Sequence, residues 1–67
     1  MINFTIHEGL KEAVDFWRNE SNDTLLSLLC DYAREVGFYY DNPTMREYPE
    51  TNMLAIRKVL RERLEAK

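Results

Sequence analysis

The chain has few of the residues with which small domains cross-link or bind metal. Only one cysteine, Cys30, and one histidine, His7, occur among its 67 residues. An intramolecular disulfide is therefore impossible, and a zinc site built from cysteine and histidine lacks ligands. Because the core of so short a chain supplies only about 3–5 kcal/mol of net stability, close packing or self-association must provide the remaining support, and we favour self-association.

Long apolar runs and an excess of positive charge are also lacking. The first residues have neither the basic opening nor the apolar run of a signal peptide, and no stretch approaches the roughly 18 apolar residues of a membrane-spanning helix. The net charge is −3 with 31% charged residues, so charge alone does not predict binding of the whole molecule to nucleic acid or to an anionic membrane. We expect a cytoplasmic protein in which residues 1–67 form a single domain.

Glycine and proline are scarce, with two residues of each, and 45% of the chain is hydrophobic. This composition argues against disorder. Turn-forming residues cluster near 19–23 and 37–49, and the three segments between them predict an all-α fold, a small three-helix bundle. Residues 2–6 alternate in polarity as a strand would, but no second strand is evident, so we favour a short extended N-terminal arm lying on the core.

The first helix is predicted to start after Thr5, which forms a capping-box pattern with Glu8. Its apolar residues recur with helical spacing and share one face. These residues are Ile6, Leu10, Ala13, Val14 and Trp17. Charged residues, including Glu12, lie on the opposite, solvated face, so the pattern predicts an amphipathic helix that packs on a core.

The second helix is predicted from about Thr24 to Val36, with Gly37 ending it in the left-handed conformation. Apolar residues cover about half of its circumference, which is wider than an ordinary surface helix needs. They are Leu25, Leu26, Leu28, Leu29, Cys30, Tyr32, Ala33 and Val36. We therefore expect this helix to be the central one, with more apolar surface than two short neighbours can cover.

Residues 38–48 are predicted to form an aromatic-rich connection between the second and third helices. Within it, Asn42 and Pro43 are typical of a cap and first position, and they predict one short helical turn. Pro49 is expected to start the third helix. The buried stripe of that helix is predicted to comprise Met53, Ile56, Leu60 and Leu64, with Val59 at its margin.

The reactive side chains lack the partners that catalysis requires. Cys30 has apolar helical neighbours, which favours a structural thiol, and His7 is interpreted as a surface or capping residue. The carboxylate pair Asp31 and Glu35 is typical of a solvated helix face, and no glycine-rich phosphate loop is present. We predict no enzyme activity, no cofactor and no metal site. The alternative left open is an enzyme subunit that borrows catalytic groups from a partner.

The aromatic residues around the connection are the feature that indicates a function. Tyrosine combines a large apolar body with a polar tip and is a frequent binding anchor, although an aromatic loop can instead close over the end of a core. We predict a small protein-interaction or adaptor domain that binds another protein or a second copy of itself, without a membrane. The predicted partner-binding residues are Phe38, Tyr39, Tyr40, Tyr48, Leu54, Arg57 and Arg61.

A second hypothesis concerns the basic residues of the third helix. Arg57, Lys58 and Arg61 form the strongest local basic group, which Arg46 would join from the connection. Such a patch is typical of a nucleic-acid-associated accessory protein, but Glu62 and Glu65 on the same helix reduce its positive potential. Binding to nucleic acid is therefore kept as the alternative to binding protein.

Overall fold

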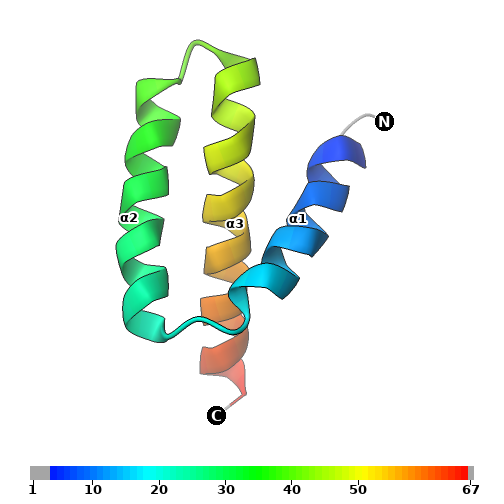
Figure 1. The fold of residues 1–67 in the computed structure, drawn as a ribbon, viewed down its shortest axis with the longest axis vertical. Coiled ribbons are helices and arrows are strands. Elements are labelled where there is room, and N and C mark those ends of the chain that lie inside the picture. Colours follow the sequence, from blue (N-terminus) through cyan, green and yellow to red (C-terminus); the bar gives the residue numbers. More distant parts are fainter. Residues whose placement is uncertain (1–3, 67) are drawn as a thin grey trace.

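The computed structural model describes the backbone of residues 4–66 and the side chains of residues 9–66. These residues form three α-helices: α1 (Phe4–Trp17), α2 (Asn22–Phe38) and α3 (Pro43–Glu65). Figure 1 shows α2 and α3 side by side in opposite directions, while α1 lies on the other side of α3 at an inclined angle. The prediction of an all-α three-helix bundle is confirmed.

The central helix is α3. The prediction that α2 is central, which was based on the wide apolar face of α2, is wrong. Both α1 and α2 pack on α3, but they barely touch each other. Since α3 contains 23 residues, it is about 34 Å long at a rise of 1.5 Å per residue and offers two shorter helices a surface each. The width of an apolar arc indicates how much surface a helix is able to bury, but it does not determine how many neighbours that helix has.

The buried core lies where α1 and α2 meet α3. Its hydrophobic members are Val14, Trp17, Leu25, Ala55, Ile56 and Val59. Val14 and Trp17 confirm the predicted apolar face of α1, with Leu10 and Ala13 packed beside them. The side chain of Ile6, also assigned to that face, lies outside the described residues.

The predicted stripe of α3 was partly wrong. Ile56 is buried as expected, but Val59 lies in the middle of the core rather than at its margin, and Leu64 is 70% exposed. Met53 and Leu60 are half-buried. The predicted stripe assumed one packing surface, whereas α3 contacts a helix on each of two sides, so its buried face is centred between them.

Helix α1 begins at Phe4, so it already includes Thr5, the predicted cap. Residues 4–6 of the predicted extended arm are therefore helical, and the rest of that arm lies outside the described residues. Adding a residue to an existing helix gains one hydrogen bond without a new nucleation cost. The alternating polarity of these residues was therefore a weaker signal than their continuity with the helix.

Helix α2 begins two residues before the predicted start. The hydroxyl of Ser21 accepts a hydrogen bond from the Thr24 N–H at 3.2 Å and caps the helix. At the other end the helix continues through Gly37 to Phe38, and Gly37 does not take a positive φ. The predicted left-handed stop is wrong because the last turn continues with helical geometry.

The connection between α2 and α3 comprises only residues 39–42, rather than 38–48. Asn42 caps α3 as predicted, accepting from the Met45 N–H at 3.2 Å, and Pro43 is the first helical residue. Pro49 does not start the helix but lies buried within it. Proline removes its own N–H bond and crowds the carbonyl four residues earlier, but the flanking turns retain their hydrogen bonds, so α3 continues past it.

Candidate functional site

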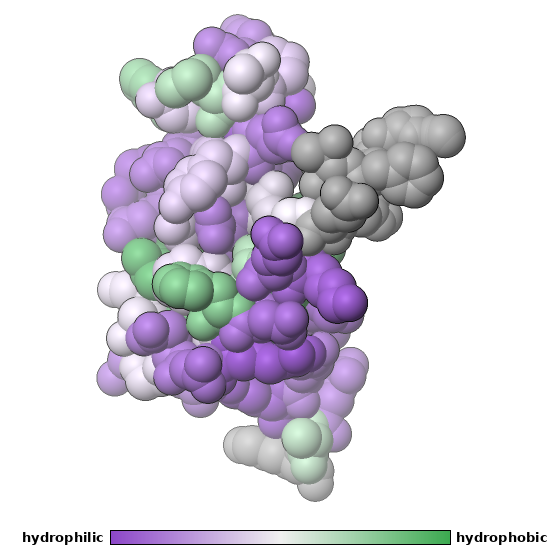
Figure 2. Space-filling view, turned by 45° about the vertical axis from the view of Figure 1, so that its right-hand side comes forward, coloured by the Kyte–Doolittle hydropathy of each residue, from purple (hydrophilic) through white to green (hydrophobic). Residues whose placement is uncertain are grey.

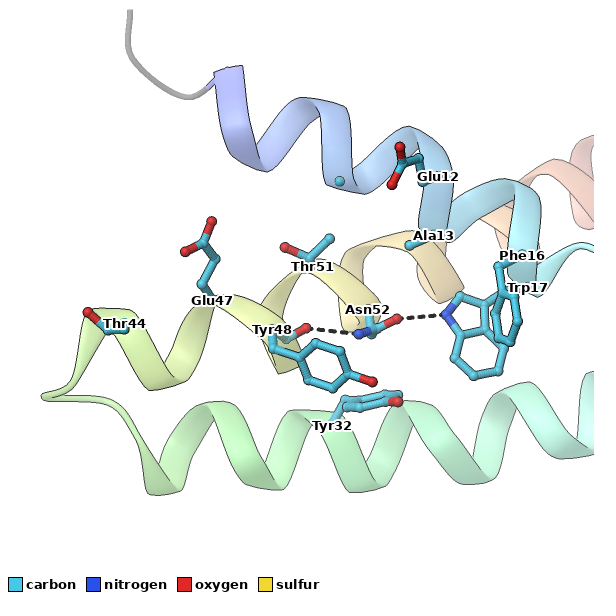
Figure 3. A pocket seen from close by; sticks show the side chains of 11 residues that line it. Glu12, Ala13, Phe16, Trp17, Tyr32, Thr44, Glu47, Tyr48, Thr51 and Asn52 are labelled. Carbon is cyan, nitrogen blue, oxygen red and sulfur yellow. Dashed lines mark hydrogen bonds between the residues drawn. The ribbon is translucent and has the colours of Figure 1, made fainter.

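An open groove lies between α1 and the N-terminal half of α3. Figure 1 shows that the N-terminal end of α1 leans away from α3, and Figure 3 shows the side chains that line the resulting space. Its volume is about 830 Å³, and α2 contributes Tyr32 to its wall. All three helices therefore form this groove, which the sequence patterns did not predict.

Four aromatic rings form one wall of the groove. The rings of Phe16 and Trp17 meet edge to face with centroids 4.8 Å apart. Trp17 and Tyr32 follow at 6.4 Å, then Tyr32 and Tyr48 at 6.1 Å. Trp17 is buried, but Phe16 and Tyr48 at the two ends are 66% and 67% exposed. The two terminal rings of the series are therefore accessible, while the two rings between them are packed against their neighbours.

A buried polar side chain holds this wall in place. The Trp17 Nε1–H donates to Asn52 Oδ1 at 2.9 Å, and Asn52 Nδ2 donates to the Tyr48 carbonyl oxygen at 3.0 Å. Asn52 is only 8% exposed, so its amide satisfies the indole N–H in the absence of bulk water. Sequence reasoning missed this residue, although its position one helical turn before Ile56, on the buried face, was a usable signal.

The groove is acidic at its rim. Glu12 comes from α1 and Glu47 from α3, and Figure 3 shows them on opposite sides of the space between these helices. No lysine or arginine is among the described residues that line the groove. Burial raises the pKa of Tyr32 to about 12, and the hydroxyl of Tyr48 adds to the shift. Tyr32 is therefore neutral at physiological pH, and the two carboxylates set the charge of the groove.

The predicted aromatic residues fall in two places. Tyr48 belongs to α3 and lines the groove, whereas Phe38 and Tyr40 are exposed at the end of the bundle where α2 joins α3. Tyr39 is half-buried there, and its ring meets Phe38 edge to face at 4.9 Å. Phe38 and Tyr40 therefore do not close over the core, which was the other interpretation of these aromatics.

The remaining predicted partner-binding residues lie further along α3. Leu54 is half-buried, and Arg57 and Arg61 are exposed. At 1.5 Å per residue, the two arginines lie about 13 and 20 Å along the helix from Tyr48. The structure therefore divides the seven predicted residues among the groove, the end of the bundle and the C-terminal half of α3.

The predicted basic group is also divided. Arg46 donates through Nη1 to the Tyr40 carbonyl oxygen at 2.7 Å, and its Nε lies 3.5 Å from Glu50. It is thus held at the α2–α3 connection, about 16 Å along the helix from Arg57. Lys58, in the C-terminal group, pairs with Glu62 at 4.0 Å. Arg46 therefore does not join the other basic residues in one patch.

The described candidates for chemistry, Cys30, Asp31 and Glu35, lie outside the residues that line the groove. Cys30 is exposed rather than packed among its apolar neighbours, because α2 is covered mainly by α3 and this side of it stays open. Asp31 is paired with Arg34 at 3.4 Å on the surface. These residues contain no group of three or more metal-ligating side chains, and the side chain of His7 lies outside them.

Arg63 is a second residue that sequence reasoning missed. Its Nη2 donates to the carbonyl oxygens of Arg18 and Glu20, both at 2.8 Å, and its Nη1 donates to Asn22 Oδ1. These bonds attach the connection between α1 and α2 to the last turns of α3. They position the C-terminal half of α1, which carries two of the aromatic rings of the groove.

Neither a protein-family model, nor a curated protein, nor a solved structure matches this chain significantly. Within residues 4–66, no helix combines the length and apolarity needed to cross a membrane. A functional interpretation therefore depends on the groove and on the residues that surround it.

Proposed function

We propose that this chain is a non-enzymatic protein-interaction domain that docks a partner protein in the aromatic groove. The observation that carries the proposal is the pair of exposed rings, Phe16 and Tyr48, at the ends of a packed aromatic series. Exposed aromatic rings beside a concave apolar surface are typical of binding anchors. The groove volume of about 830 Å³ is that of a site for a few side chains rather than for a whole helix.

The groove is better suited to docking than the other apolar surfaces of the molecule. Leu26 is 51% exposed on α2, and Phe38 is exposed at the end of the bundle, but neither lines this groove. On the face of the molecule that Figure 2 draws, the apolar areas are separated by hydrophilic residues. The groove wall is held by a buried hydrogen bond from Trp17 to Asn52, and a preorganised wall lowers the entropy cost of binding.

The proposal is tested by site-specific photocross-linking. A photoreactive phenylalanine analogue at position 16 is expected to capture a discrete partner from cells that express the chain, and the same analogue at position 64 is not. Leu64 is a matched control because it is 70% exposed, compared with 66% for Phe16, and lies outside the groove. Equal capture from both positions would count against the groove.

Affinity for the purified partner provides the second step. We expect Phe16→Ala to weaken binding about tenfold or more, as is typical for the loss of an aromatic anchor, and Leu64→Ala to leave it unchanged. Unchanged affinity in Phe16→Ala would refute the proposal. Sedimentation is expected to show a monomer; a dimer that Phe16→Ala dissociates would identify a second copy as the occupant instead.

A further inference from the structure

We infer that the groove recognises a cationic segment of its partner, in which an apolar side chain is flanked by lysine or arginine. This inference rests on the proposed docking function and adds the chemistry of the ligand. Its basis is the combination of the aromatic wall with two carboxylates, Glu12 and Glu47, on opposite sides of the same space. Neither carboxylate forms an ion pair with any side chain among residues 9–66.

The aromatic rings and the carboxylates suit the two parts of a long basic side chain. The alkyl stem of lysine or arginine packs on apolar surface while its charged head stays near water. A cation over the face of an aromatic ring is also attracted by the ring itself. The exposed rings of Phe16 and Tyr48 offer such faces, and Glu12 or Glu47 can then pair with the charged head.

The basic residues of α3 do not pair with Glu47, and Lys11, next to Glu12 on α1, lines a separate hollow with Arg18 and Lys58. The basic group on α3 starts at Arg57, about 15 Å along the helix from the carboxylate-bearing Glu47, which is beyond the screening length of about 8 Å at physiological salt. Arg46 is bound to the Tyr40 carbonyl oxygen and lies beside Glu50. The net charge of −3 attracts a cationic segment and repels an acidic one at long range.

Selection from a random octapeptide library on the purified full-length chain tests the inference. We expect the selected peptides to contain an apolar residue next to lysine or arginine, and few aspartates or glutamates. Binding can be followed by the fluorescence of Trp17, the only tryptophan, which lies in the groove wall. Added salt is expected to weaken binding, as for any contact between exposed charges.

Two charge-matched double variants locate the interaction. The double variant Glu12→Gln with Glu47→Gln is expected to lower the affinity for the selected peptides about tenfold, since it removes two negative charges that would pair with the peptide's cations. Asp23→Asn with Glu65→Gln gives the same net charge but changes exposed residues outside the groove, and is expected to leave affinity unchanged. Equal losses in both variants would show that only the overall charge matters, and would overturn the inference.

The outcomes separate this inference from the proposed function. The selected peptides could be neutral or acidic and lose their affinity in the Phe16→Ala variant. That result would overturn the cationic preference and leave the docking function intact. Cationic peptides that bind equally to Phe16→Ala would exclude the groove as their site and overturn the inference. If no peptide is selected, the cationic preference is also rejected, and cross-linking from position 16 then decides the docking function independently.

Discussion

Replacing Asn52 with alanine is expected to destabilise the domain through the loss of one buried polar contact. The Asn52 amide accepts from the Trp17 indole N–H at 2.9 Å and donates to the Tyr48 carbonyl oxygen at 3.0 Å. Both Asn52 and Trp17 are buried, at 8% and 9% exposure, so water does not readily replace the amide. The Asn52→Ala variant therefore leaves the indole N–H without a partner in the core.

The magnitude is large for a domain of this size. An unsatisfied buried donor costs about 1–3 kcal/mol, and the truncated side chain also loses its packing contacts. A total of about 2–3 kcal/mol is a large part of the roughly 3–5 kcal/mol that a core of this size supplies. At about 4–8 °C per kcal/mol, the melting temperature is expected to fall by roughly 10–20 °C.

Urea unfolding followed by circular dichroism measures this loss, and a double-mutant cycle assigns it to the hydrogen bond. Asn52→Leu keeps a side chain of similar size but leaves the Trp17 donor unpaired, so it is also expected to destabilise the fold. Combining Asn52→Leu with Trp17→Phe removes donor and acceptor together. That pair is expected to be more stable than the sum of the single changes by about 1 kcal/mol.

Two results would refute the reasoning about Asn52. One is a loss below about 0.5 kcal/mol in Asn52→Ala, which is the range of ordinary surface substitutions. The other is strict additivity of the Asn52→Leu and Trp17→Phe effects, because independent sites share no bond. Either result would mean that the indole N–H finds another partner in solution.

Three further predictions follow from single side chains. Gly37→Ala is expected to raise the free energy of unfolding by about 0.5–1 kcal/mol in denaturant titration, because Gly37 is helical and an added Cβ would meet no other side chain within 4 Å. A lower free energy of unfolding would indicate the left-handed stop instead. Arg63→Ala is expected to lower the free energy of unfolding by about 1–3 kcal/mol in the same assay, because two carbonyl oxygens lose their donor. Arg61 is exposed, so Arg61→Ala is expected to change the free energy of unfolding by no more than about 0.5 kcal/mol. Equal losses in the two variants would contradict the role of Arg63. Because the pKa of Tyr32 is raised from 10.0 to about 12 in the fold, its contribution to stability is complete below pH 10 and lost as the pH rises towards 12. Tyr32→Phe should abolish that component of the alkaline loss, and a late step in tyrosinate absorbance should disappear with it.

Much of the local structure was predictable from the sequence. The spacing of Val14 and Trp17 identified the buried face of α1, and Asn42 with Pro43 marked the start of a helix. These features depend on residues within one or two turns of each other, whose geometry is set by backbone hydrogen bonds and capping. The number and type of the helices follow from such local preferences.

The candidate site was much less predictable. Tyr48 was predicted to bind a partner and lines the groove, but the other aromatic residues of the groove, Phe16, Trp17 and Tyr32, come from other helices. Glu12 was interpreted only as part of a solvated face. Glycine and proline also misled the prediction of helix ends. Helix α2 continues through Gly37 and α3 continues through Pro49, because the hydrogen bonds of the neighbouring turns outweigh the local cost of each residue.

Local periodicity was enough to establish three amphipathic helices, because each helix satisfies its backbone hydrogen bonds within itself. It did not establish which helix lies at the centre, how each is rotated about its axis, or which side chains meet. Those properties depend on how the apolar surfaces of all three helices are buried at the same time, and here the length of α3 lets it cover both others. The groove exists because α1 and α2 share that support without covering each other.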